Sequence, residues 1–455
     1  MSEEMRQESW ERLETLVEAG DAKRLEDYLS TLSSADIARA ISRLDEDDRA
    51  GLLTLLEPED AADLIEELSD VQGADLIEDL PAHRAAAIVD EMESDHRVDI
   101  LGELDDEDVE AILRAMDPEE AKDARQLLTY EEDSAGGIMV TDFLLYRETM
   151  TVAEVLEDLR RNAEEYADYT VLYLYVENAK GVLIGVVPMR DLVLKPGGAA
   201  LRSIMIVNPI SVATDTSLDE VEQLFDRYGF VGVPVTDRYG RIAGVVRRAD
   251  AEQAHGERTE RTFMRLSGIV GGDELRSMPM VSRTFRRMAW LGLNLILSVL
   301  AATVIFLFED VIEQVVVLAV MIPIICNMSG CSGNQSVAVS IRELALGLIK
   351  PRDFLLVLTK EAQVAAVNGV VLGGLLALLA FAVKGNPYLG LVVGAALALN
   401  TILSATLGGV IPLFLRRLNI DPALAAAPIL MTVVDMCGFF LILGFAALVL
   451  TRLTG

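Results

Sequence analysis

One carboxylate, Asp435, stands near the middle of the last long apolar run of the chain, between Ile429 and Leu450. A run of about 20 apolar residues is enough to cross a bilayer. A charge at that depth costs about 2.5–3.5 kcal/mol even on the lenient insertion scale, so it must face protein or a water-filled path. Asp435 therefore predicts a cation site in a conduction path. The alternative is a protonated or hydrogen-bonded carboxyl between packed helices.

Small and neutral polar residues cluster in two other apolar runs. Broken helices expose backbone groups that lipid does not tolerate, so we expect the Gly-rich stretch 329–333 to interrupt its run and face protein or water. Amide and hydroxyl oxygens suit the water shell of Mg²⁺, which gives up its waters reluctantly. Tight helix packing through small residues and an interhelical hydrogen bond are the alternatives. The predicted pore-lining residues are Gly330, Gly333, Asn334, Gln335, Ser336 and Asn400.

The charge of the chain is distributed unevenly. The 455 residues hold 72 acids and 39 bases, a net charge of −33, yet the part from Met288 onward holds eight of each. The whole excess of acid therefore precedes the apolar runs. Such a surface repels nucleic acid and attracts cations, although it could serve solubility alone. The three cysteines and three histidines show no disulfide framework or metal spacing, and no nucleophile–base pair or phosphate loop indicates an enzyme.

Two repeats organise the part before the membrane. In residues 1–128 short amphipathic units recur about every 12 residues, and Ala61–Leu68 is nearly restated as Gly73–Leu80. Each unit buries too little apolar surface alone, so stacking into an all-α superhelix is expected. Residues 129–250 hold a second, α/β tandem repeat, in which Gly181–Val187 recurs as Gly240–Val246. Each copy, about 129–196 and 197–250, predicts a helix, a strand, a Gly-containing turn and a second strand.

These two copies resemble a pair of CBS modules, which usually sense small ligands. Their nucleotide-binding signature has Ser or Thr after the last strand and Asp three residues later. Asp191 and Asp250 match the acid, but Pro188 and Arg247 replace the hydroxyl residue. Nucleotide binding at the pair is therefore doubtful, and an ion-sensing or structural role gains weight.

The remaining residues predict a connecting helix and linker, 251–287, and a five-span membrane domain, 288–455. The spans are expected at about 288–308, 312–348, 354–383, 389–413 and 429–450. The excess of Lys and Arg predicts cytoplasmic N-terminal domains and a C-terminus outside the cell inner (plasma) membrane. Four charged residues that flank spans are interpreted as interfacial: Arg342, Glu343, Lys360 and Glu361.

The order of these parts resembles the MgtE family of magnesium channels over essentially the whole chain. The most specific matches are Glu132–Met139, Gly333–Ser336, Asp421–Ala423 and Asp435. The resemblance implies a homodimer with a pore on its two-fold axis that admits hydrated Mg²⁺, and Asp435 matches the pore carboxylate. It also implies that cytosolic Mg²⁺ bridges the helical domain, the CBS pair and the connecting (plug) helix, which closes the pore.

The regulatory acids implied in this way are Asp237, Asp250, Glu252, Glu257 and Glu260. The chain departs from the family here, because Arg247, Arg248 and several plug-helix bases stand among acids. We hypothesise that arginines replace some bridging ions by direct salt bridges. A coupled carrier for another divalent cation such as Mn²⁺ or Co²⁺, and a membrane sensor without transport, remain alternatives. A further intramembrane ionisable residue would favour the carrier, and the sequence indicates none besides Asp435.

Overall fold

The computed structural model describes residues 3–163, 166, 169, 172–270, 274–276, 278 and 280–454. It divides into two compact units, which are described separately. One comprises Met1–Thr259 and Leu275–Met278, and the other comprises Glu260–Glu274 and Pro279–Gly455.

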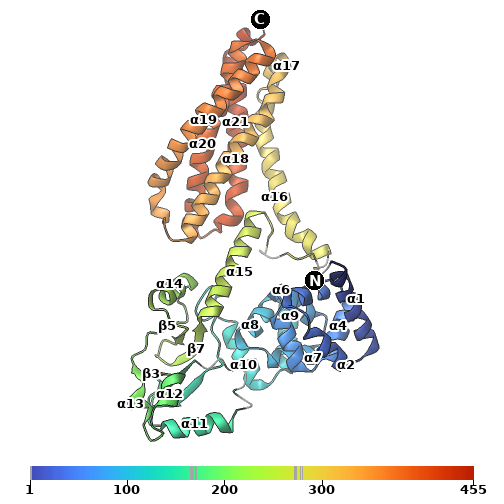
Figure 1. The fold of residues 1–455 in the computed structure, drawn as a ribbon. Coiled ribbons are helices and arrows are strands. Elements are labelled where there is room, and N and C mark those ends of the chain that lie inside the picture. Colours follow the sequence, from blue (N-terminus) through green and yellow to red (C-terminus); the bar gives the residue numbers. More distant parts are fainter. Residues whose placement is uncertain are drawn as a thin grey trace. The chain divides into compact units, whose positions relative to one another are not determined.

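The first unit begins with a superhelix of short helices. Several of its helices begin at an N-cap side chain that accepts a hydrogen bond from a backbone N–H group of the first turn, which explains where these helices start. These N-cap residues are Asp21, Ser33, Asp45 and Asp117. Helices two apart pack together, so the apolar faces form one continuous core. The helices, blue to cyan in Figure 1, are α1 (Glu3–Ala19), α2 (Ala22–Leu29), α3 (Ser34–Ile41), α4 (Glu46–Leu55), α5 (Pro58–Glu66), α6 (Asp70–Glu78), α7 (Ala82–Glu91), α8 (Ser94–Glu103), α9 (Asp106–Ala115) and α10 (Pro118–Leu127).

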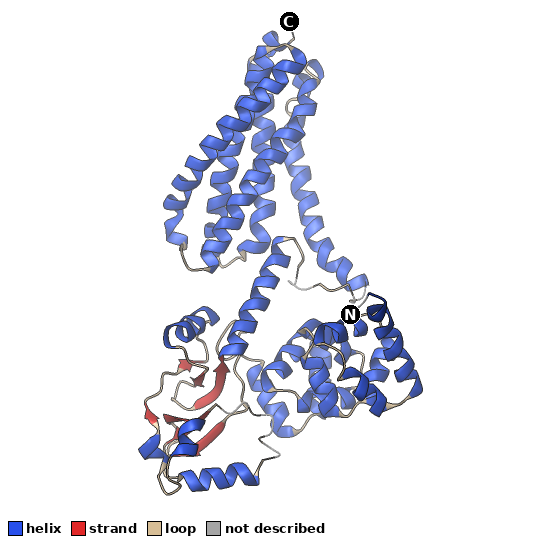
Figure 2. Ribbon diagram, viewed as in Figure 1, coloured by secondary structure: helices blue, strands red, loops and turns tan. Residues whose placement is uncertain are grey.

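Two small sheets follow, and their shared topology confirms the tandem α/β repeat. In each sheet a parallel pair is followed by an antiparallel hairpin, giving the orders β1-β2-β3-β4 and β5-β6-β7 (Figure 2). The strands are β1 (Leu144–Arg147), β2 (Tyr173–Glu177), β3 (Leu183–Pro188), β4 (Ile206–Val207), β5 (Val212–Ala213), β6 (Gly232–Thr236) and β7 (Ile242–Arg247). The helices are α11 (Val152–Arg161), α12 (Met189–Leu194), α13 (Leu201–Ile204) and α14 (Leu218–Tyr228).

A connecting helix, α15 (Arg248–Leu266), starts directly after β7. Among the described residues, five helical segments are long and apolar enough to cross a membrane, as expected. The helices after α15 are α16 (Met280–Phe306), α17 (Glu309–Gln314), α18 (Val317–Ala345), the 3₁₀ turn η1 (Pro351–Asp353), α19 (Phe354–Lys384), α20 (Pro387–Arg417), α21 (Pro422–Leu448) and α22 (Leu450–Leu453).

The expected interruption at residues 329–333 is wrong, because α18 runs unbroken through this stretch. Its glycines make close helix contacts instead. A Cβ added to Gly333 would lie 2.3 Å from the Ser404 hydroxyl oxygen, and one added to Gly408 would lie 2.3 Å from the Gly333 carbonyl oxygen. Without side chains, the backbones of α18 and α20 approach closely while both helices keep their own hydrogen bonds. Tight helix packing through small residues, the alternative interpretation of these glycines, therefore explains the continuous helix.

We expect Gly408→Ala to destabilise the membrane domain by about 1–3 kcal/mol, because the new methyl group meets backbone atoms that cannot move aside. The matched control is Gly374→Ala in α19, where an added Cβ meets nothing within 4 Å. Thermal stability of the purified protein in detergent measures both. Equal melting temperatures for the two variants would contradict the close approach.

Candidate cation path and regulatory contact

Asp435 lies in the middle of α21, where its side chain is half-buried. The helix is started by Asp421, whose carboxylate accepts the Ala423 N–H at 2.8 Å, with Pro422 at the first helical position. This cap sets the residue at which α21 begins. The carboxyl interacts with the thiol of Cys326 from α18.

Asn400 of α20 lies close to Cys326, beside Gly438 of α21. A Cβ added to Gly438, one turn after Asp435, would lie 2.8 Å from the Asn400 Nδ2 atom and 3.2 Å from the Cys326 sulfur. Gly438 therefore makes the room in which an amide, a thiol and a carboxylate from three helices converge. Asn400 is fully buried, and neither end of its amide has a hydrogen-bond partner in the described protein. The structure thus brings together two of the residues predicted for the path, Asp435 and Asn400.

The remaining predicted path residues, all on α18, divide between two faces. Gly330 packs beneath the Met431 sulfur, and Gly333 packs on α20, so both lie inside the protomer. Ser336 is also buried, and its hydroxyl donates to the Glu361 carboxylate at 2.6 Å. Asn334 and Gln335 point outward.

Those two amides belong to a polar stripe on the exposed surface of α18. Its members are Asn327, Cys331, Asn334 and Gln335. Their spacing of four, seven and eight residues places them on one face of the helix. Cys326, beside the first of them, contacts Asp435. Because lipid cannot satisfy amide groups, this face requires a polar neighbour or water. Asn327 was not among the predicted path residues, although its heptad spacing from Asn334 indicates the same helix face.

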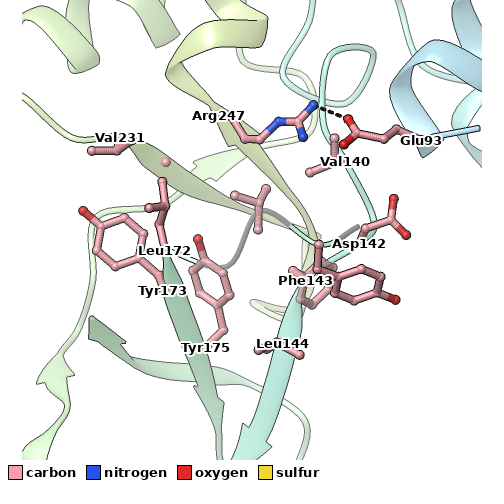
Figure 3. Close-up of a pocket in the computed structure, with 13 residues that line it drawn as sticks. Glu93, Val140, Asp142, Phe143, Leu144, Leu172, Tyr173, Tyr175, Val231 and Arg247 are labelled. Atoms are coloured by element: carbon pink, nitrogen blue, oxygen red, sulfur yellow. Dashed lines mark hydrogen bonds and ion pairs between the residues drawn. The ribbon is translucent and has the colours of Figure 1, made fainter. Parts of the chain in front are cut away.

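In the first unit, the acids of two domains converge on Arg247 at the end of β7. Its guanidinium donates to Glu93 at 2.7 Å and to Asp95 at 3.0 Å, both from the superhelix, and to Asp250 at 2.7 Å. Figure 3 shows the arginine reaching across to Glu93, beside a cleft that Tyr173 and Tyr175 line. Arg247 thus supplies the positive charge at a place where three carboxylates meet.

Burial changes the protonation of these acids. It raises the pKa of Asp250 to about 6, and the nearby Asp95 adds to the rise, although the hydrogen bond from Arg247 lowers it. Burial also raises the pKa of Asp95 and, well above its usual range, that of Asp99. The hydrogen bonds of Arg247 to Glu93 and Asp250 raise its pKa although burial lowers it, so it stays charged.

These shifts predict how stability depends on pH. The folded pKa of Asp250 lies above its unfolded value, so its contribution is complete below the unfolded pKa and is lost as pH rises through the folded pKa. The loss from about pH 5 to about pH 7 is about 1.4 kcal/mol for one such group. Thermal unfolding of the first unit in the intact protein measures this loss. Asp250→Asn should reduce the dependence of stability on pH, whereas Asp226→Asn, which changes an exposed ion pair, should not. An equal pH dependence in the two variants would contradict the assignment to Asp250.

The other predicted regulatory acids do not share this site. Asp237 is at the opposite end of β7, where its carboxylate accepts the N–H groups of Tyr239 and Arg241 in a turn. On α15, Glu252 pairs with Arg248, and Glu257 accepts from Gln253. Glu260 is exposed. Glu93 and Asp95 were not among the predicted regulatory acids, because nothing in their spacing indicates which strand they will meet.

Basic residues attach the two ends of α15 within their respective units. In the first unit, Arg258 donates to Asp219 of α14 at 2.9 Å, and the His255 ring lies 3.0 Å from Glu222. In the second unit, Arg265 donates to Asp421 at 3.2 Å. Leu266 packs against a core that includes Val434, the neighbour of Asp435. The end of α15 therefore contacts the helix that carries the path carboxylate.

The spanning helices, the intramembrane carboxylate and the CBS pair define a multi-pass membrane transport protein rather than an enzyme. The family model for divalent cation transporters matches residues 322–445, that for the MgtE intracellular N domain matches 32–133, and that for CBS domains matches 135–196 and 201–254. A magnesium transporter MgtE of Thermus thermophilus is 35% identical over 330 residues, which is 72% of each chain. The chain belongs to the MgtE family, which confirms the resemblance and the expected fold class.

Two solved structures are similar to the part of the chain before the spanning helices. The soluble part of a magnesium transporter is 27% identical with a TM-score of 0.50, and it covers 56% of this chain and 99% of its own. The cytosolic domain of the Mg²⁺ channel MgtE in complex with ATP is 33% identical with a TM-score of 0.48, covering 53% of this chain and 98% of its own.

Proposed function

We propose that this protein carries Mg²⁺ into the cytosol through a path lined by Asp435 and the polar stripe of α18. The stripe is the observation that carries the proposal, since its three amide side chains on the exposed face of an apolar helix require water or a polar partner. Asp435 supplies the negative charge that a divalent cation needs. Family membership and the magnesium transporter relative support Mg²⁺ as the ion.

A second copy of the chain is the proposed neighbour of the stripe. Two copies facing each other would enclose the amides in a hydrated pore and bring two Asp435 carboxylates to one ion. One carboxylate from each copy attracts a hydrated Mg²⁺ yet leaves its waters in place, so that the ion can leave again. The N-terminal domains are then cytoplasmic, because basic residues precede α19 and follow α20, and the C-terminus lies outside.

Cys331 provides a direct test, because its exposed thiol lies in the stripe. We expect a hydrophilic thiol reagent to slow Mg²⁺ uptake into liposomes that contain the intact protein, since the adduct would obstruct the path. Cys331→Ser should make uptake insensitive to the reagent, and Cys437→Ser, the matched control on α21, should leave the sensitivity intact. Uptake that ignores a reagent shown by mass spectrometry to have modified Cys331 would contradict the assignment of this face.

We further propose that the cytosolic unit regulates the path through α15. Burial raises the pKa of Asp99 most, and unfavourable interactions with Asp70 of the superhelix, Glu132 of the segment between α10 and β1, and Glu257 of α15 raise it further. Acids of three segments therefore repel one another there. Divalent cations would reduce that repulsion and favour closure of the unit. At the neighbouring contact Arg247 already supplies a permanent positive charge. We therefore expect regulation by cytosolic Mg²⁺ to rest on the acids around Asp99 more than on Asp250.

Nucleotide sensing at the CBS pair is disfavoured. The cleft in Figure 3 has aromatic walls, but Glu93 and Asp142 line it together with Arg247, whose charge is already paired with carboxylates. Phosphate groups would meet those acids. We expect equilibrium dialysis of the intact protein with MgATP to show no saturable binding below millimolar concentration. Micromolar affinity that is lost in a Tyr175→Ala variant would contradict this expectation.

A further inference from the structure

Glu361 is a second carboxylate inside the membrane domain. It follows the start of α19 at Phe354 by seven residues, which is about 10 Å along the helix. The side chain turns inward to α18, where it pairs with a hydroxyl, and the interfacial position of this residue stays a prediction. Its neighbour Lys360 is exposed. Together with Asp435, Glu361 lies more than one turn inside a described spanning helix.

The site around Glu361 is built by three helices. The Ser336 hydroxyl, 95% buried, donates to the Glu361 Oε2 atom at 2.6 Å. Gly409 of α20 provides the space, since a Cβ there would lie 2.7 Å from Glu361 Cγ. The fully buried Ser340 donates to the Gly409 carbonyl at 2.9 Å and fixes this stretch of α20. These contacts hold the carboxylate in one position.

The charge of Glu361 is not neutralised by a basic side chain. Its hydrogen bond comes from a neutral hydroxyl, and no ion pair joins it to Lys or Arg in the described part of the chain. An ionised carboxylate that is withdrawn from water costs several kcal/mol unless a cation or proton compensates it. A mobile cation that binds here would supply the positive charge that this half-buried carboxylate lacks.

Helix α18 contacts both this carboxylate and Asp435. Cys326, which contacts Asp435, and Ser336, which contacts Glu361, are ten residues apart, or about 15 Å along the helix. We propose that Glu361 and Ser336 form a second cation site, cytosolic to Asp435, for a hydrated divalent cation. A single carboxylate and one hydroxyl suit Mg²⁺, which keeps several of its waters. This inference rests on the proposed transport of Mg²⁺ and the orientation argued above.

Protection from a carbodiimide tests the site. Dicyclohexylcarbodiimide modifies carboxyl groups in apolar surroundings, and mass spectrometry of the intact protein, digested after reaction, locates the adduct. We expect modification of Glu361 without divalent ions and several-fold less in millimolar Mg²⁺, with Na⁺ at equal ionic strength giving no protection. Glu361→Gln removes the adduct and verifies its position. Ser336→Ala should keep the adduct and weaken the protection, because the carboxylate loses its fixed donor.

The outcomes separate this inference from the proposed function. Protection retained in Asp435→Asn shows that the ion binds at Glu361 itself, and protection lost there shows that only Asp435 binds and overturns the second site. Modification that Mg²⁺ does not change, or a Glu361 that never reacts while Asp435 does, identifies a purely structural hydrogen bond and also overturns it. Mg²⁺ uptake without protection contradicts this site alone. Protection in a protein that shows no uptake contradicts the transport proposal alone.

Discussion

Asp435→Asn should lower Mg²⁺ uptake into liposomes by about tenfold to a hundredfold, since it removes the charge from the middle of α21 while keeping the shape of the side chain. Each tenfold corresponds to about 1.4 kcal/mol, and a carboxylate acting on a divalent ion in partly hydrated surroundings supplies several kcal/mol. The fluorescence of a Mg²⁺ indicator trapped inside the liposomes follows uptake directly.

The matched control is Asp353→Asn, a carboxylate of the same domain that stabilises the 3₁₀ turn η1 before α19 by accepting the Lys350 N–H. Asparagine can also accept this hydrogen bond, so uptake should not change. Normal uptake by a correctly inserted Asp435→Asn protein would remove Asp435 from the path and favour the protonated carboxyl between helices. If both variants lose uptake equally, the loss reflects the surface charge of the domain and not a site at Asp435.

Arg247→Gln should make the contact between the superhelix and the CBS pair dependent on divalent cations. Without the guanidinium, Glu93, Asp95 and Asp250 face one another without the charge of the arginine, and loss of one partner of a largely buried ion pair costs about 3–5 kcal/mol. In the absence of Mg²⁺ we expect the two domains to separate and their linker to become sensitive to protease. Millimolar Mg²⁺ should restore protection, because it replaces the lost charge.

The neighbouring Arg248 provides the matched control, since it pairs with exposed Asp226 and Glu252 on the surface. Arg248→Gln should leave protease sensitivity unchanged with and without Mg²⁺, as exposed pairs contribute little. The unchanged protein should be protected at this contact even without Mg²⁺. Strong dependence of its protection on Mg²⁺ would contradict the role of Arg247 and would restore a bridging ion as the main connection.

The sequence by itself determined the parts of this protein and their order. The period of about 12 residues predicts stacked helices, and the restated strand motifs predict two similar sheets. The five apolar runs predict the spanning helices, because length and hydropathy are local properties of the chain. Asp435 could be identified for the same reason, since a charge in such a run is conspicuous whatever surrounds it.

Only the tertiary structure decided which distant side chains meet. The sequence of the Gly-rich stretch 329–333 predicts a helix break. In the structure its glycines contact α20 and α21, and the helix continues. Glu361 stands near a span end in the sequence, and only the positions of Ser336 and Gly409 show that it turns inward. In the sequence, Arg247 only replaces the hydroxyl residue of the nucleotide-binding signature. In the structure it binds Glu93 and Asp95, which lie more than 150 residues earlier. Such pairings depend on how helices rotate and pack, which local sequence patterns do not specify.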